Sequence, residues 1–206
     1  MRRKDFECDD RHKGQLFLDQ CHDGVLATLT KDNTPVVRAM NFVRIDDFIY
    51  FHGATSGEKI EGLAQAASFT AYKALSLIPS HWSDERNACP VTSLFQSVVV
   101  KGVFNLVMDV EPKAIVMQKL MEKLQPEGKF LPLNTNLDFY EKALNRVSIF
   151  MLSTAYLSYK IKLGQNWDLE KRQRVKSLLL QRGASIDRET VELMEEFGLF
   201  FTKIEP

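Results

Sequence analysis

The most restrictive feature of the sequence is a run of alternating residues from Ser97 to Met108. One face of this run is almost wholly apolar, whereas the other face carries Ser97, Lys101 and Asn105 between valines. Side chains that alternate with a period of two belong to a β-strand, and a strand with one apolar and one partly polar face fits the wall of a small barrel. The sequence therefore favours an architecture built from antiparallel strands.

More strands are predicted on both sides of this run. From Gly24 to about Ser80 the pattern is typical of a β-meander, with a tight turn at Asp46 and Asp47. Residues 146–161 are predicted to form a second long strand that shares one apolar face. The β-like pattern is interrupted once, where apolar residues recur at helical spacing and predict a helix over 57–67.

Other segments carry a helical period and predict helices outside the strands: residues 10–21, 111–124, 137–144, 168–181 and 187–197. Antiparallel strands interrupted by helices predict an α+β protein with a barrel core. We expect one domain over residues 1–206, with the barrel over about 24–163 and a C-terminal helical extension over about 168–206. The Rossmann and P-loop glycine signatures are missing from the sequence.

Charge and cysteine content exclude several classes of function. Lys and Arg total 27 and are balanced by 27 Asp and Glu, so no overall field draws the chain to nucleic acid. No apolar run approaches the roughly 20 residues that span a bilayer, and no signal peptide is evident, so we expect a cytoplasmic protein without a membrane partner. The three cysteines, Cys8, Cys21 and Cys89, are expected to be free thiols, and no metal site is predicted.

The segment from His52 to Lys59 is the strongest candidate for chemistry. Lys59 falls in the first turn of the helix predicted over 57–67, where a cation is unfavourable unless an anion binds there. Ser56 is suited to the N-cap, and free N–H groups beside the flexible Gly53 and Gly57 would complete a phosphate cradle. The alternative is an exposed lysine with an ordinary helical partner.

Arg38 lies in a strand that is otherwise rich in apolar residues. Arg38 and Lys59 are predicted to converge on one dianion, with Arg38 forming a bidentate contact and Lys59 acting as a point charge. A salt bridge from Arg38 to Asp46, Asp47 or Glu58 is the alternative.

Two aromatic features remain open on sequence grounds. His52 would serve as a donor or proton relay beside an anion, or alternatively as a packed residue, since no nucleophile is evident near it. Trp167, with Gln165 and Asn166, would cover a planar ring or else pack in the core.

Three segments together resemble a known family: Gly24–Leu29 with Pro35–Arg38, Ile49–Ala54 through Gly57–Lys59, and Ser97–Gly102. In this order and spacing they are similar to the FMN-binding split β-barrel proteins related to pyridoxamine 5'-phosphate oxidase, especially the branch of nitroimidazole-reductase-like flavin-binding proteins. The resemblance implies a six-stranded antiparallel split β-barrel with peripheral helices. It also implies a homodimer with two FMN molecules at its interface.

The resemblance assigns roles to individual residues. Arg38 and Lys59 would bind the FMN phosphate, and His52, Gly53 and Ala54 would lie along the flavin edge. Polar contacts would be added by Asn41 and Ser97, and the segment with Gln165, Asn166 and Trp167 would reach the flavin bound mainly by the partner protomer.

The sequence departs from true pyridoxamine-phosphate oxidases at three places. Val43 stands where those enzymes have a lysine, Gly57-Glu58-Lys59 replaces their Ser-Arg-Lys motif, and their C-terminal Arg-x-His signature is missing. These departures argue against oxidation of pyridoxamine phosphate.

The resemblance implies an FMN-dependent oxidoreductase, in which the flavin takes hydride from NADH or NADPH and passes electrons to a small-molecule acceptor. His52 is the candidate catalytic residue, and the loop over residues 79–93 is expected to influence substrate choice. A non-catalytic flavin-binding or regulatory protein, and haem or deazaflavin binding on the same barrel, are the alternatives.

Overall fold

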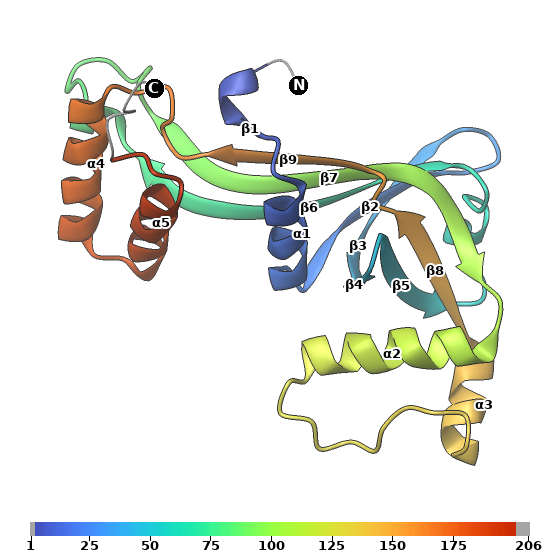
Figure 1. The fold of residues 1–206 in the computed structure, drawn as a ribbon. Coiled ribbons are helices and arrows are strands. Elements are labelled where there is room, and N and C mark those ends of the chain that lie inside the picture. Colours follow the sequence, from blue (N-terminus) through green and yellow to red (C-terminus); the bar gives the residue numbers. More distant parts are fainter. Residues whose placement is uncertain (1–2, 201–206) are drawn as a thin grey trace. The chain divides into compact units, whose positions relative to one another are not determined.

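The computed structural model describes residues 3–200 and shows an α+β protein built on an antiparallel sheet, as the sequence predicts (Figure 1). The chain divides into two compact units. We call residues 10–71 and 98–158 the barrel unit, and residues 1–9, 72–97 and 159–206 the helical unit. Within the described residues, no helix is both long and apolar enough to cross a membrane.

The sheet of the barrel unit follows the order β3-β2-β6-β7-β8-β5-β4. The long strands β6 and β7 contribute residues to both units. The strands are β2 (Asp23–Leu29), β3 (Pro35–Asn41), β4 (Val43–Ile45), β5 (Phe48–Ala54), β6 (Ala66–Ile78), β7 (Thr92–Val107) and β8 (Val147–Ser153). The helices are α1 (Arg11–Gln20), α2 (Val110–Leu124) and α3 (Asp138–Arg146), with a short 3-10 helix η2 (Glu58–Ile60).

Phenylalanine side chains fill the interior of the barrel unit. The ring centroids of Phe51 and Phe69 lie 5.2 Å apart, and those of Phe104 and Phe150 lie 5.0 Å apart. All four side chains are fully buried. Because paired residues share a face of a sheet, Leu26, which pairs with Phe69, also points into this interior. The apolar face predicted for β7 is therefore confirmed from Val98 to Phe104.

Helix α2 covers the opposite face of β5 and β8, as Figure 1 shows. Val116 and Leu120 of α2 form a buried cluster with Ile149 of β8 and Val43 of β4. Strand β8 is consequently buried on both faces, because Phe150 points into the barrel interior while Ile149 contacts the helix.

The single strand predicted over residues 146–161 is wrong in one respect, because the chain forms two strands, β8 and β9 (Tyr156–Lys162). The break lies at Thr154, which is fully buried. Its N–H donates to the Asp47 carbonyl at 2.8 Å, and its hydroxyl accepts from Arg11 at 3.2 Å, so these contacts replace ladder pairing. The described chain has nine strands rather than the expected six, while the split-barrel class holds.

The helix predicted over residues 57–67 is also wrong, since only η2 and following turns occupy this segment. Gly57 has φ +103° and Ala64 has φ +59°, and neither conformation belongs to an α-helix. The N–H of Ala64 donates to the Phe104 carbonyl at 2.8 Å, so the chain pairs with β7 before a helix can extend. Tertiary pairing overrides the local helical period here.

The helical unit contains β1 (Glu7–Cys8), β9, α4 (Leu169–Arg182) and α5 (Ser185–Glu196), with the ends of β6 and β7. The loop predicted over 79–93 holds a short 3-10 helix, η3 (Ser80–Trp82), and β7 begins at Thr92. Both C-terminal helices predicted from the sequence are confirmed within two residues.

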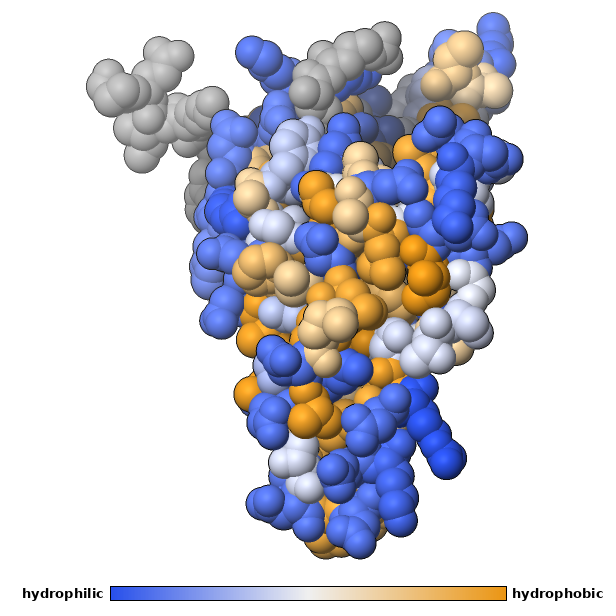
Figure 2. Space-filling view, turned by 90° about the vertical axis from the view of Figure 1, so that its right-hand side faces the viewer, coloured by the Kyte–Doolittle hydropathy of each residue, from blue (hydrophilic) through white to orange (hydrophobic). Residues whose placement is uncertain are grey.

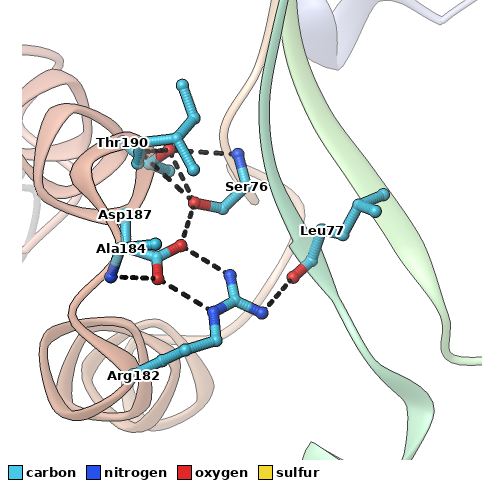
Figure 3. Close-up of polar contacts among 7 residues, drawn as sticks. Ser76, Leu77, Arg182, Ala184, Asp187 and Thr190 are labelled. Carbon is cyan, nitrogen blue, oxygen red and sulfur yellow. Dashed lines mark hydrogen bonds and ion pairs between the residues drawn. The ribbon is translucent and has the colours of Figure 1, made fainter.

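A buried polar network fixes α4 and α5 to β6 within the helical unit (Figure 3). The fully buried carboxylate of Asp187 accepts from the Arg182 Nε at 2.8 Å and from the Ser76 hydroxyl at 2.6 Å. Arg182 also donates to the Leu77 carbonyl at 2.9 Å, and the Ala184 N–H donates to Asp187 at 3.2 Å. The carboxylate thus caps the start of α5 and joins three segments.

The network predicts a specific acid dependence of stability. Hydrogen bonds from Arg182 are the main cause that lowers the pKa of Asp187 from 3.8 to about 2. Because the folded-state pKa is depressed, the stabilisation is complete above about pH 4 and is lost as pH falls toward 2, with a magnitude of about 2 kcal/mol. Urea unfolding between pH 2.5 and 5 should show this component in the wild type and not in Asp187→Asn. Parallel pH profiles for the two proteins would contradict it.

Candidate functional site

Arg38 occupies the middle of β3 and is largely shielded from solvent. Its Nη1 donates to the hydroxyl of the buried Thr28 at 2.8 Å. Its Nη2 lies 3.6 Å from the Glu58 carboxylate. Of the three carboxylates that the sequence offers as salt-bridge partners for Arg38, Glu58 is therefore the one in contact.

Lys59 reaches toward Gly53 at the end of β5. A Cβ atom at position 53 would lie only 2.7 Å from the Lys59 Nζ, so glycine makes room for the lysine side chain. The Lys59 Nζ also lies 5.9 Å from the centroid of the Phe150 ring. The absence of a side chain at Gly53 thus determines where this cation lies.

Arg38 and Lys59 reach the same face of the sheet. Arg38 pairs with Leu26, and Leu26 pairs with Phe69, so Arg38 is on the interior face. Gly53 is two residues after the interior Phe51 and shares its face. We call Thr28, Arg38, Gly53, Glu58 and Lys59 the basic cluster.

The basic cluster differs from the predicted phosphate site at the start of a helix. The segment after Gly57 is a three-residue 3-10 helix without a side-chain N-cap, so the expected helix dipole does not contribute. Thr28 belongs to the cluster because the register of β2 and β3 brings it into contact with Arg38. Glu58 belongs to it because the loop after Gly57 brings its carboxylate close to Arg38. No sequence pattern pointed to Thr28, whereas Glu58 was only one of three open partners for Arg38.

His52 lies on the other face of β5. It pairs with Ile149, which contacts α2, so its side chain shares the face of Tyr50 rather than that of Gly53. Among the described residues, its Nδ1 is buried without a hydrogen-bond partner. Burial, and secondly the positive charge of Lys59, lower the pKa of His52 below its usual value of 6.5. A neutral imidazole at pH 7 follows.

This environment predicts the titration of His52. In an NMR titration, the imidazole should protonate below pH 6.5, because burial and Lys59 disfavour its cationic form. Replacing Lys59 by glutamine should raise the pKa of His52 by removing one of the two causes. A His52 pKa at or above 6.5 in the wild type would contradict the buried position of its imidazole near the charge of Lys59.

Asn41 and Ala54 do not join the basic cluster. Asn41 lies three residues after Arg38 on the same strand, so its side chain points to the opposite face. Its Nδ2 donates to the His22 carbonyl at 3.4 Å. Ala54 pairs with Val147 at the exposed end of β5, on the face of His52.

The remaining predicted residues belong to the helical unit. Ser97 is half-buried in β7, beside the buried Gln96. Gln165 bonds to its own segment, accepting from the Leu163 N–H at 2.7 Å and donating to the Ile161 carbonyl at 2.8 Å.

Trp167 packs its ring closely over Gly164, whose φ of +86° suits glycine. The Lys171 Nζ lies 5.2 Å from the centroid of this ring. Asn166 is exposed. Trp167 is therefore partly buried and packs against its own segment rather than in the core.

Hollows are present among the described residues of the barrel unit. One of about 290 Å³ is shared between β2, β6 and β7, and its lining comprises Ala27, Thr28, Leu29, Pro35, Ala66, Ala67, Ser68, Lys101 and Gly102. Thr28 therefore belongs both to this hollow and to the basic cluster. A second hollow of about 460 Å³ lies beneath the start of α2, next to Tyr50 and Met151.

The outer face of the sheet in the barrel unit exposes apolar side chains. Val37 is 62% exposed and Val103 is 49% exposed, and both neighbour residues that point inward. Hydrophobic residues also gather in the middle of the molecular face shown in Figure 2. Apolar areas of this kind mark surfaces that bind ligands or proteins.

Residues 3–200 contain no group of three or more histidine, cysteine or acidic side chains able to hold a metal ion. Within the described residues, Cys8, Cys21 and Cys89 form no disulfide bond.

Comparison with known proteins gives a family match over most of the chain. The family model described as pyridoxamine 5'-phosphate oxidase matches residues 10–152. A curated protein from Xenopus tropicalis, the A subunit of eukaryotic translation initiation factor 3, is 27% identical over 96 residues. That match covers 43% of this chain, and the chain spans only 7% of the length of that protein.

Solved structures show the same fold at low sequence identity. The flavocytochrome Anf3 from Azotobacter vinelandii has a TM-score of 0.64 at 21% identity, covering 76% of this chain and 69% of that one. The FAD and haem binding protein from Mycobacterium smegmatis has a TM-score of 0.64 at 17% identity, covering 81% and 78%. A protein described as a putative 5-nitroimidazole antibiotic resistance protein from Bacteroides thetaiotaomicron has a TM-score of 0.60 at 18% identity, covering 75% and 86%.

Proposed function

The chain belongs to the pyridoxamine 5'-phosphate oxidase family, and from this premise we propose that it binds FMN through the basic cluster and acts as a flavin-dependent oxidoreductase. The observation that carries the proposal is the placement of Arg38 and Lys59, from separate segments, on one face of the barrel.

The side chains of the cluster suit a phosphate group. The Arg38 guanidinium has five N–H donors in a planar fork, and its contact with Thr28 holds it in place. Lys59 adds a compact positive charge, and the missing Cβ of Gly53 leaves it room. A guanidinium and an ammonium group on the same face of the sheet are suitable groups to bind the dianionic end of FMN.

The hollow beside Thr28 supports the same proposal. Its lining is mostly apolar, which suits a flavin ring, and it meets the basic cluster at Thr28. At about 290 Å³ it is at the lower limit of the roughly 300–1,000 Å³ typical of ligand pockets. We therefore propose that a second copy of the chain, packed on the apolar outer face of the sheet, completes the site in a homodimer. In that dimer, Ser97 and residues 165–167 are proposed to add flavin contacts.

Bound FMN would supply the redox chemistry by accepting hydride from NADH or NADPH and passing electrons to a small acceptor. The chain's own part is to anchor the phosphate through Arg38 and Lys59 and to exclude water from the ring. His52 is proposed as a neutral group that tunes the site from the opposite face of β5. Oxidation of pyridoxamine phosphate is not proposed, because Val43 and Glu58 replace basic residues that the family's oxidases use.

Haem binding on the same barrel is a second candidate. The solved structures from Azotobacter vinelandii and Mycobacterium smegmatis are described as a flavocytochrome and as an FAD and haem binding protein. A haem would give an intense absorption band well separated from the flavin bands. FAD in place of FMN would be distinguished after its release from the protein.

One experiment separates these candidates. Protein purified from flavin-replete cells should be yellow, should release FMN on denaturation, and should lose its flavin colour on anaerobic mixing with NADH or NADPH. Colour without bleaching by either nucleotide would favour a non-catalytic or regulatory flavin-binding protein. A colourless protein that takes up neither flavin nor haem would contradict the proposal.

A further inference from the structure

We propose that Glu58 is an internal competitor for the phosphate site, which a phosphate-bearing ligand displaces from Arg38. The inference rests on the proposed function, because it concerns the same cluster. It adds a role for a residue whose charge is the wrong sign for phosphate binding.

The two members of the ion pair are held very differently. The Arg38 side chain is 19% exposed and is fixed by its hydrogen bond to Thr28. The Glu58 side chain is 67% exposed, and its carboxylate approaches Arg38 only to 3.6 Å. An exposed pair of this length contributes little, so the carboxylate can leave at low cost while the guanidinium stays in place.

The backbone around Glu58 supports this asymmetry. Glu58 follows Gly57, which has φ +103° and makes no side-chain cap, and it begins the short helix η2. Its side chain therefore lies at the edge of the cluster, while Lys59 turns inward over Gly53. The adjacent residues Lys59 and Glu58 therefore have opposite effects at this site. Lys59 favours a bound anion, whereas Glu58 disfavours it.

Competition follows from simple electrostatics. A phosphate dianion and the Glu58 carboxylate both require the Arg38 Nη2, and two anions at this distance repel each other. Binding of FMN should therefore include the cost of breaking the Arg38–Glu58 contact. Riboflavin has the same ring and no phosphate, so its binding should not include that cost.

The test uses Glu58→Gln, which keeps the shape of the side chain and removes its charge. Glu61→Gln is the matched control, because Glu61 lies in the same loop but accepts from the Lys31 N–H at 3.3 Å instead of contacting Arg38. Equilibrium titrations by flavin fluorescence quenching should use FMN and riboflavin with the wild-type chain of residues 1–206 and both variants.

Glu58→Gln is expected to tighten FMN binding by about 2- to 5-fold and to leave riboflavin binding unchanged, while Glu61→Gln changes neither. If Glu58→Gln leaves FMN affinity unchanged or weakens it while the wild type binds FMN, the competition is overturned and the proposed function stands. Equal gains in both variants would show a general charge effect and would also overturn it. No FMN binding by any of the proteins would overturn both proposals.

Discussion

Replacing Arg38 by methionine is expected to weaken FMN binding by about 10- to 150-fold, because a charge-assisted hydrogen bond to phosphate contributes about 1.5–3 kcal/mol. Methionine retains much of the apolar length of arginine, so packing beside Leu26 should survive. Riboflavin affinity should change little, since riboflavin lacks the group that Arg38 binds. Titration with both flavins measures the effect.

The control for this prediction is Arg44→Met. Arg44 is 20% exposed, nearly the same as Arg38, and it forms a bidentate pair with Asp19 through bonds of 2.9 and 2.6 Å. Arg44→Met should alter FMN affinity by less than about 2-fold. This variant shows how much affinity is lost merely because a part-buried arginine is removed. Similar losses of FMN affinity in both variants, or equal losses for FMN and riboflavin in Arg38→Met, would contradict phosphate binding by Arg38.

Asp187→Asn is expected to reduce the free energy of unfolding of the protein by about 3 kcal/mol. The amide cannot accept all the hydrogen bonds that the carboxylate receives, and it leaves the Arg182 guanidinium without its counter-charge. For a chain of this size, such a loss corresponds to a fall in Tm of about 6–12 °C. Thermal unfolding followed by circular dichroism measures it.

Glu189→Gln provides the comparison on the same helix. Glu189 pairs with Lys73, and both side chains are more than a third exposed. Its loss should therefore cost below about 1 kcal/mol and lower Tm by no more than about 4 °C. The buried network would not have the assigned role if the two variants unfolded at the same temperature.

The strands and helices with strong periodicity were predictable from the sequence. The alternating face predicted over residues 97–108 is confirmed from Val98 to Phe104, and the helical period over 111–124 is confirmed by α2, because burial against one neighbouring layer selects for these patterns. The turn at Asp46 and Asp47 is confirmed by the pairing of Ile45 with Phe48.

Features set by partners distant in sequence were not predictable. Residues 57–67 carry a helical period, yet Ala64 pairs with Phe104, which is 40 positions away along the chain. Likewise, Thr154 breaks the strand over 146–161 because it bonds to Arg11 and Asp47. Local patterns contain no information about such contacts.

The candidate site was predictable in part. Arg38 and Lys59 were identified by residue type and position, and the structure puts both on the interior face. The roles of Thr28 and Glu58 depended on strand register and on the path of the loop after Gly57. His52 and Gly53 point to opposite faces of β5, because side chains alternate along a strand. The face on which His52 lies depends on its pairing with Ile149, which contacts α2.

Binding of FMN by its phosphate is the property on which the proposed function depends. Equilibrium titration of the flavin-free wild-type protein with FMN and with riboflavin tests it most directly. We predict that FMN binds at least about 10-fold more tightly than riboflavin, as expected for one charge-assisted contact to the phosphate. Equal affinities for the two flavins, or no binding of FMN, would contradict it.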